Sequence, residues 1–400
     1  MSKKILVMAL VLYVVSATAT FTLLSAQGGN NDQGVSQQGQ DNTDTPAGTT
    51  TLGSLLKIDP NEPRDQVCPL NGALYTATEK KAWEEHRPIA VMIENTPDAR
   101  PQSGISNADV VFEAVAEGGV TRFMAFFYCG AQRDDILVAP VRSARSYFVD
   151  WASGFNRPLY VHVGGANLPG PANALGQLSD YGWKLNNDID AMSESYPTFV
   201  RNYNRIEGKE VATEHTMESS TERIWKVADK RKWTNMSPER KVGKTVVPAK
   251  DWKEGFTPWN FSTEKVAAGS VTKFGYEFWS GYSDYAVEWQ YDATTNMYKR
   301  VLGGAPHIDL NTNQQVTAGT VVVLLTTEKG PIDEKKHMLY TTVGTGDALI
   351  YKNGEEVKAR WSKKDREAPL MFVDSKGKDV ALNPGLIWVS VVDKATQILK

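Results

Sequence analysis

The pattern of hydrophobic and polar positions divides the chain into segments of different character. Ile5–Ala26 carries no charged residue and follows Lys3 and Lys4. As a helix, a run of this length crosses a hydrocarbon core of about 30 Å. Residues 1–26 are therefore either a signal peptide, cleaved near Ala17-Thr18-Ala19, or an N-terminal membrane anchor. Both interpretations keep Lys3 and Lys4 in the cytoplasm and place the rest of the chain outside it.

Residues 27–57 consist mainly of Gln, Gly, Asn, Asp, Ser and Thr. Such a segment buries too little apolar surface to offset the entropy of ordering it. We therefore expect a disordered polar tether between the membrane and a folded body.

Short apolar runs alternate with helical patterns over residues 58–235. Strands are predicted near 88–93, 109–117, 120–128, 136–141 and 159–163. Helices are predicted near 147–155 and 219–233, the second starting at a capping box of Ser219 and Glu222. This alternation predicts an N-terminal α/β domain with a mixed sheet.

The pattern changes to a period of two residues after a mixed segment, 236–268, which we interpret as a linker or excursion. Residues 269–400 contain alternating runs and a hairpin signal at Asn353-Gly354. We expect a predominantly antiparallel β-rich domain there, so that the whole chain belongs to the α+β class.

The composition narrows the possible classes of protein. The 44 basic and 47 acidic residues give a formal charge of −3, which argues against a nucleic-acid partner. The chain contains 2 cysteines, too few for a zinc ribbon or a disulfide-dense scaffold. Outside the cytoplasm such a pair tends to oxidise, so we predict a Cys68–Cys129 disulfide. The alternative is two unrelated buried thiols.

Candidate site residues first appear in the hairpin predicted around Gly118-Gly119. A two-residue turn pairs Glu117 with Val120, Val115 with Arg122 and Glu113 with Met124. This register places Glu113, Glu117 and Arg122 on one face, with Arg122 diagonal to both glutamates. The cluster is either a surface charge network or the wall of a polar site.

Two arginines follow where the next strand leads into a helix. Arg142 and Arg145 can share one face and, with the free N–H groups of the helix start, suit an anionic group. They can equally bind internal carboxylates. His162 lies at the end of a strand and His215 in a loop, and both join the candidate ligand-binding set.

Familiar catalytic motifs are absent from the sequence. Gly243-Lys244-Thr245 lacks the remaining glycine of a phosphate-binding loop, and neither His-Glu-x-x-His nor Gly-x-Ser-x-Gly occurs. His307 and Asp309 could supply two metal ligands, but without a partner the pattern favours a structural pair. We therefore assign no metal and no cofactor.

Several ordered segments together resemble one family. These are Arg87–Ile93, Ala99–Gly104, Ala108–Glu113, Glu117–Phe123, Pro140–Arg145, Tyr160–Gly165, Tyr298–Arg300, His307–Asp309, Gly354, Trp361 and Asn383–Gly385. The pattern is similar to that of the YerB-like lipoproteins, the domain-of-unknown-function 3048 family. The resemblance implies a bacterial envelope protein with N- and C-terminal domains, but no reaction. The chain lacks the family's lipobox cysteine, which favours a membrane helix over a lipid anchor.

Two functions remain open, and the sequence does not decide whether the protein is an enzyme. The first is binding of an anionic cell-envelope ligand (a glycan, a peptide or a wall fragment) or of an envelope protein. The alternative is a hydrolase acting on wall glycan or peptide, with Glu113 and Glu117 as acid and base. At i and i+4 of a strand their Cβ atoms lie roughly 13 Å apart, long for such a pair.

Overall fold

The computed structural model describes residues 55–237, 239–242, 244–264 and 269–400. The predicted membrane segment, residues 1–26, and all but the last residues of the predicted tether lie outside this part. Within the described residues, no helix combines the length and the apolar character needed to cross a membrane. The described residues belong to one compact unit.

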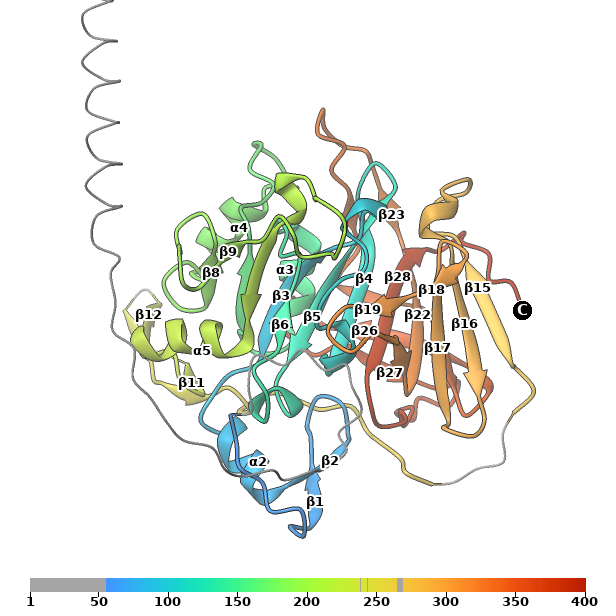
Figure 1. The fold of residues 1–400 in the computed structure, drawn as a ribbon, viewed down its shortest axis with the longest axis horizontal. Helices are drawn as coiled ribbons and strands as arrows, with labels where there is room; N and C mark the ends of the chain where they lie inside the picture. The colour runs from blue at the N-terminus through green and yellow to red at the C-terminus, as the bar shows by residue number, and fades with distance from the viewer. Residues whose placement is uncertain (1–54, 238, 243, 265–268) are drawn as a thin grey trace, which may run out of the picture. The chain divides into compact units, whose positions relative to one another are not determined.

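A 10-stranded mixed sheet forms the centre of this unit (Figure 1). Its strands, in spatial order, are β27 (Met371–Val373), β26 (Glu355–Lys363), β25 (Gly344–Lys352), β22 (Thr320–Thr326), β28 (Ile387–Asp393), β4 (Val110–Glu117), β5 (Val120–Phe127), β3 (Ile89–Glu94), β7 (Leu159–His162) and β8 (Asp188–Asp190). β28 pairs in parallel with both β22 and β4. The sheet therefore joins strands from both predicted domains.

The residues of the central strands explain their position. β3, with the sequence IAVMIE, is buried along its whole length, and β28 is buried except at its last residue. Near-continuous runs of Val, Ile and other apolar residues are typical of strands covered on both faces. The described part is consequently mostly β, and the coarse α+β class is confirmed.

Four α-helices accompany the sheets in the described residues: α2 (Ala77–Trp83), α3 (Ser146–Ser153), α4 (Ala174–Asp180) and α5 (Thr221–Lys230). A capping box of Thr76 and Glu79 starts α2. The N-cap of α5 is Ser220, which accepts a hydrogen bond from Arg223 N, and not Ser219 as predicted. The side chain of Ser219 instead donates to the carbonyl of Thr198.

A smaller antiparallel sheet contains β15 (Lys273–Tyr276), β16 (Val287–Asp292), β17 (Met297–Leu302) and β18 (Ala305–Pro306), with β21 (Thr317–Ala318) also pairing with β17. The other strands form sheets of two or three: β1 (Arg64–Val67) with β2 (Leu74–Thr76); β6 (Leu137–Val138) and β9 (Val200–Arg201) on either side of β10 (Met217–Ser220); β11 (Met236–Ser237) with β14 (Lys250–Asp251); β12 (Arg240–Val242) with β13 (Thr245–Val247); β19 (Ile308–Asp309) with β20 (Gln314–Gln315); and β23 (Glu328–Lys329) with β24 (Leu339–Tyr340).

The predicted disulfide between Cys68 and Cys129 is present. It ties the segment that carries β1 and β2 to the chain just after β5. Asp109 lies beside it and accepts hydrogen bonds from Asn71 Nδ2 and from the backbone N–H groups of Tyr128 and Cys129. Burial raises the pKa of Asp109 to about 7, although the backbone hydrogen bonds lower it.

Candidate functional site

The hairpin of β4 and β5 has a different register from the one we predicted. Glu117 pairs with Val120 as expected, but Val115 pairs with Thr121 instead of Arg122, and Glu113 with Phe123 instead of Met124. A β-bulge between Val115 and Glu117 causes the shift, because two residues of β4 there oppose one residue of β5.

The bulge separates the two glutamates. Glu113 contacts Thr121, whereas Glu117 contacts Arg122. Thr121 and Arg122 are consecutive in a strand, so their side chains point to opposite faces of the sheet. The prediction that Glu113, Glu117 and Arg122 share one face is therefore wrong for Glu113.

Glu117 is held by two arginines. Its Oε1 accepts from Arg122 Nη2 at 2.7 Å, and its Oε2 accepts from Arg145 Nη2 at 2.6 Å and from Arg145 Nε at 3.0 Å. Burial raises the pKa of Glu117, but the positive charges and hydrogen bonds of Arg122 and Arg145 outweigh this and lower it to about 2. Glu117 is thus a carboxylate at any physiological pH.

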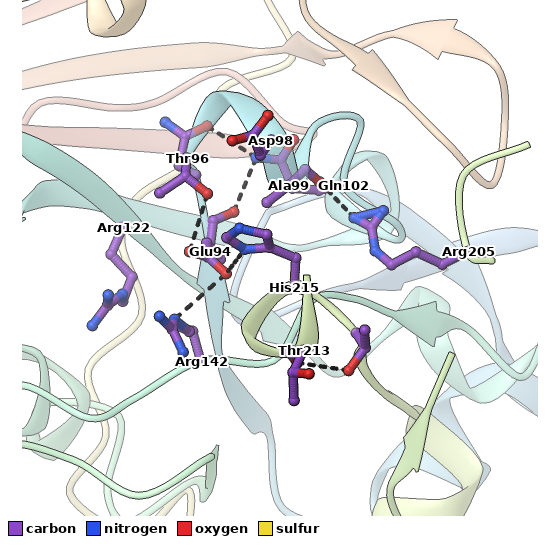
Figure 2. Close-up of polar contacts among 12 residues, drawn as sticks. Glu94, Thr96, Asp98, Ala99, Gln102, Arg122, Arg142, Arg205, Thr213 and His215 are labelled. Atoms are coloured by element: carbon purple, nitrogen blue, oxygen red, sulfur yellow. Dashed lines mark hydrogen bonds and ion pairs between the residues drawn. The ribbon is translucent and has the colours of Figure 1, made fainter. Parts of the chain in front are cut away.

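Glu94, at the end of β3, is a second carboxylate on the same face, because it pairs across the strands with Arg122. Its Oε2 lies 2.8 Å from His215 Nδ1 and 3.4 Å from Arg142 Nε. Figure 2 shows His215 and Arg142 approaching this carboxylate, with Thr96 on its other oxygen. Sequence reasoning missed Glu94, although a charged residue directly after a buried run, at the carboxyl end of a strand, is a recognisable signal.

We call Arg122, Arg142, Arg145, Glu94 and Glu117 the arginine cluster. It holds three guanidinium groups against two carboxylates, so it has an excess of one positive charge when His215 is neutral. The side chains of Arg122 and Arg145 are 2% and 8% exposed, whereas that of Arg142 is 29% exposed. No hydrogen bond of Arg142 Nη1 or Nη2 occurs within the described residues. Arg142 is therefore the accessible cation of the cluster.

The start of helix α3 lies next to these side chains. Arg145 is its N-cap residue, but the Arg145 side chain makes no capping hydrogen bond to the helix. Instead, the guanidinium binds Glu117 and the carbonyl of Ala144. The first N–H groups of α3 are thus not capped by that side chain, and their partial positive charge adds to that of the cluster.

Glu113 belongs to a separate, fully buried network. Its Oε2 accepts from Arg300 Nη2 at 2.7 Å and from Trp388 Nε1 at 3.1 Å, and both members of the Glu113–Arg300 ion pair are 0% exposed. Its Oε1 accepts from Thr121, which in turn accepts from Asn95. Glu113 is therefore a structural residue that links β4 to β17 and β28. Sequence reasoning did not assign Arg300 to a site, although Arg300 lies in one of the segments that carry the family resemblance.

The possible metal ligands His307 and Asp309 are both hydrogen-bonded to protein groups, and His307 belongs to the same network as Glu113. His307 Nδ1 accepts from Arg300, so His307 Nε2 donates to Gln102. Burial, together with the charges of Arg300 and Arg100, holds the pKa of His307 well below its usual range. Asp309 accepts backbone N–H groups of Ser106 and Asn311. Neither side chain points to a metal site.

The described residues contain one other grouping of metal-ligand type, Cys68, Asp109 and Cys129. Its two sulfur atoms form the disulfide, so they are not thiolate ligands.

The two histidines of the predicted set have different surroundings. His162 is 0% exposed, and its ring nitrogens lie 2.6 Å from Asp188 Oδ1 and 2.7 Å from the carbonyl oxygen of Gly164. Both nitrogens contact protein acceptors, which indicates that His162 is a structural residue. His215 contacts Glu94 through Nδ1, and no ring contact of Nε2 is found in the described part of the chain. The structure thus brings together Glu117, Arg122, Arg142, Arg145 and His215, and leaves Glu113 and His162 apart.

Comparisons with known proteins agree with this architecture. Residues 75–234 match the N-terminal domain, and residues 277–389 the C-terminal domain, of the protein of unknown function DUF3048. The chain is 28% identical over 335 residues to "Putative lipoprotein YerB" of Bacillus subtilis (strain 168), which covers 83% of this chain and 88% of that protein. The crystal structure of YerB from Bacillus subtilis superposes with a TM-score of 0.65 at 26% identity, over 84% of this chain and 100% of that chain. The protein therefore belongs to the DUF3048 family.

Proposed function

We propose that the protein binds an anionic cell-envelope ligand, and that the arginine cluster contacts its negative charge. The observation that carries this proposal is the partly exposed guanidinium of Arg142 in a cluster with one positive charge in excess. A guanidinium supplies two parallel donors that match a phosphate or carboxylate group. The buried Nε of Arg122 has no partner in the described part of the chain, which leaves a further donor near the same place.

An extracytoplasmic location is part of this proposal. The apolar segment after Lys3 and Lys4 is of the export or anchor type. The Bacillus subtilis relative bears the name lipoprotein, which denotes membrane attachment for that protein. We infer that this chain also works outside the cytoplasm, held by its N-terminal helix or released after cleavage.

The test is co-sedimentation of the full chain with isolated bacterial cell walls, before and after acid removal of their phosphodiester polymers. Arg142→Gln should lower binding to untreated walls about tenfold, because one charge-assisted contact of this kind is worth about 1.5–3 kcal/mol. Arg360→Gln is the matched control, since it removes an exposed arginine paired with Asp347. Equal binding by both variants, or equal binding to stripped walls, contradicts the proposal.

A second candidate function is hydrolysis of wall glycan or peptide, but not by the predicted glutamate pair. Glu113 is fully buried in an ion pair, where a substrate cannot reach it, and Glu117, with a pKa of about 2, cannot donate a proton near neutral pH. The contact between Glu94 Oε2 and His215 Nδ1 is the observation that favours this candidate. A carboxylate in that position orients an imidazole and leaves Nε2 available as a general base.

An assay of wall turnover distinguishes the ligand-binding function from the hydrolase function. The hydrolase predicts release of soluble fragments by the full chain, and loss of that release in His215→Gln with wall binding retained. Binding without any release of fragments would contradict the hydrolase and support only the anionic-ligand proposal.

A further inference from the structure

A cavity of about 720 Å³ lies beside the end of β15, and it shares no residue with the arginine cluster. One wall is the chain that directly follows β15, and the other is the end of β28 with the chain after it. Leu399 pairs with Gly275 of β15, so the C-terminal segment runs beside this strand (Figure 1). A cavity of this size accommodates a small molecule.

Two aromatic side chains form one corner of the cavity. The ring centroids of Trp279 and Tyr282 lie 5.4 Å apart, and the ring planes meet at 86°. Tyr282 is 41% exposed and Trp279 is half-buried, so a ligand can contact both residues. Trp279 Nε1 donates to Glu328 Oε1, which fixes the orientation of the indole. The face of such a ring attracts a cation, because the π-system is negative above its plane.

The wall of the cavity is acidic as well as aromatic. Among the described residues that line it, Glu277 and Asp393 are acidic and none is basic. Both are partly exposed. Together with Glu328 they accept hydrogen bonds from uncharged donors, and no ion pair of these three carboxyl groups occurs in the described part of the chain. The protein therefore supplies no cation there to balance their charge.

The carboxyl groups of Glu328 and Asp393 influence each other. Burial raises the pKa of Glu328, and the charge of Asp393 raises it further, although hydrogen bonds from Tyr340 and Trp279 lower it. Asp393 Oδ2 accepts from the backbone N–H of Glu328 at 3.2 Å, so the two residues are in direct contact. A cation bound beside them would relieve the repulsion between the two negative charges.

We propose that this cavity binds an organic cation with a quaternary ammonium group. Such a group has no N–H donor, so it binds through its charge and through apolar contact. The two aromatic rings, Ala395 and Leu399 offer that contact. A primary ammonium would need acceptors for three N–H donors, and both oxygens of Asp393 already accept backbone N–H groups. The proposal goes beyond the anionic-ligand function, because the ligand has the opposite charge and the residues are different.

Isothermal titration calorimetry of the full chain with choline tests the proposal. We expect choline to bind, and its uncharged analogue neohexyl alcohol, in which carbon replaces the nitrogen, not to bind. Tyr282→Leu should weaken choline binding about fivefold, because the cation–π contact is lost. Glu277→Gln should weaken it about threefold, because one negative charge of the wall is lost.

Each variant has a matched control. Tyr203→Leu removes a tyrosine of nearly equal exposure, 42%, that does not line the cavity. Glu288→Gln removes a carboxylate of β16 that is paired with Lys273. Neither control should alter choline binding. Tyr282→Phe keeps the aromatic ring and should keep the binding, which tests the ring even where Tyr282→Leu lowers the stability of the protein.

Glycerophosphocholine, the soluble form of a lipid headgroup, distinguishes two sources of the cation. Tighter binding than that of choline would assign a headgroup, and weaker binding a free cation. The proposal is overturned if neither probe binds, if neohexyl alcohol binds as tightly as choline, or if the primary amine butylammonium binds more tightly. Unchanged binding in both Tyr282→Leu and Glu277→Gln also overturns it. Since Glu277 lies outside the arginine cluster, Glu277→Gln should still bind cell walls, so this failure is distinct from failure of the anionic-ligand proposal.

Discussion

The role of each candidate residue depends on how deeply its side chain is buried and on which groups contact it. Arg142 and Arg145 were recognisable in the sequence because arginines where a strand leads into a helix suit anions. Arg122 was recognisable because the predicted hairpin places it beside glutamates. The different roles of these arginines were not predictable, because the partial exposure of Arg142 and the ion pair of Arg145 with Glu117 depend on packing between distant segments. The cysteine pair was predictable because only 2 thiols exist.

Asp109 gives a prediction at this scale. Its pKa is raised from 3.8 to about 7 in the folded protein, so between these values the folded state retains a proton that the unfolded state has lost. The free energy of unfolding contributed by this group therefore falls as the pH rises from about 4 to about 7, and is constant above. The loss should amount to roughly 2–4 kcal/mol.

Asp109→Asn removes this titration. Denaturant unfolding at pH 5 and pH 8, without reductant, should show a smaller decrease in stability for the variant than for the unchanged protein. The same decrease in both would show that other groups carry the pH dependence.

The β4–β5 hairpin shows what the alternation of apolar and polar residues can predict about a secondary-structure element and what it cannot. The β4–β5 hairpin, its Gly118-Gly119 turn and the Glu117–Val120 pair were predictable from local sequence. The bulge was not, because residues on both faces of β4 are buried and the alternation carries no register signal there. That single inserted residue moved Glu113 from the expected site to the buried ion pair with Arg300.

The two turn glycines give a prediction at the scale of the element. Both have positive φ, +55° for Gly118 and +86° for Gly119. A Cβ on Gly119 would lie 2.3 Å from Tyr282 Cε1, whereas at Gly118 the nearest atom would be Lys336 Cδ at 3.5 Å. Gly119→Ala should therefore destabilise the protein by more than about 1 kcal/mol, from backbone strain and displacement of Tyr282.

Gly118→Asn is the matched variant, because asparagine tolerates the left-handed region and the space is open. Thermal unfolding should show a clearly larger decrease of the midpoint for Gly119→Ala. Equal midpoints would mean that the turn relaxes without contact to Tyr282.

At the scale of the molecule, the sequence predicted an α/β domain followed by a β-rich domain, but not that one sheet joins them. Parallel pairing of β28 with β4 brings Ile387 next to Val110, and no local pattern reports a contact at that separation. The Glu113–Arg300 pair and the Trp388 contact reinforce the same junction. We therefore expect the described unit to unfold in one cooperative transition.

Glu113→Gln tests this expectation. The change leaves the Arg300 guanidinium buried without its carboxylate, which costs about 3–5 kcal/mol. Calorimetry should show one transition shifted to lower temperature, whereas Glu367→Gln, at an exposed glutamate paired with Arg366, should have little effect. Two separate transitions, with only one of them shifted, would contradict a single cooperative unit.

The place of β28 in the sheet also affects how the protein is made. During synthesis β4 emerges early, and its outer edge stays unpaired until residues 387–393 have left the ribosome. Until then the nascent chain exposes a hydrophobic strand edge that can pair with other chains. A chain that stops before residue 387 would retain the N-terminal family domain but would still aggregate. Premature termination or proteolysis near the C-terminus should therefore leave no folded protein, not a folded N-terminal fragment.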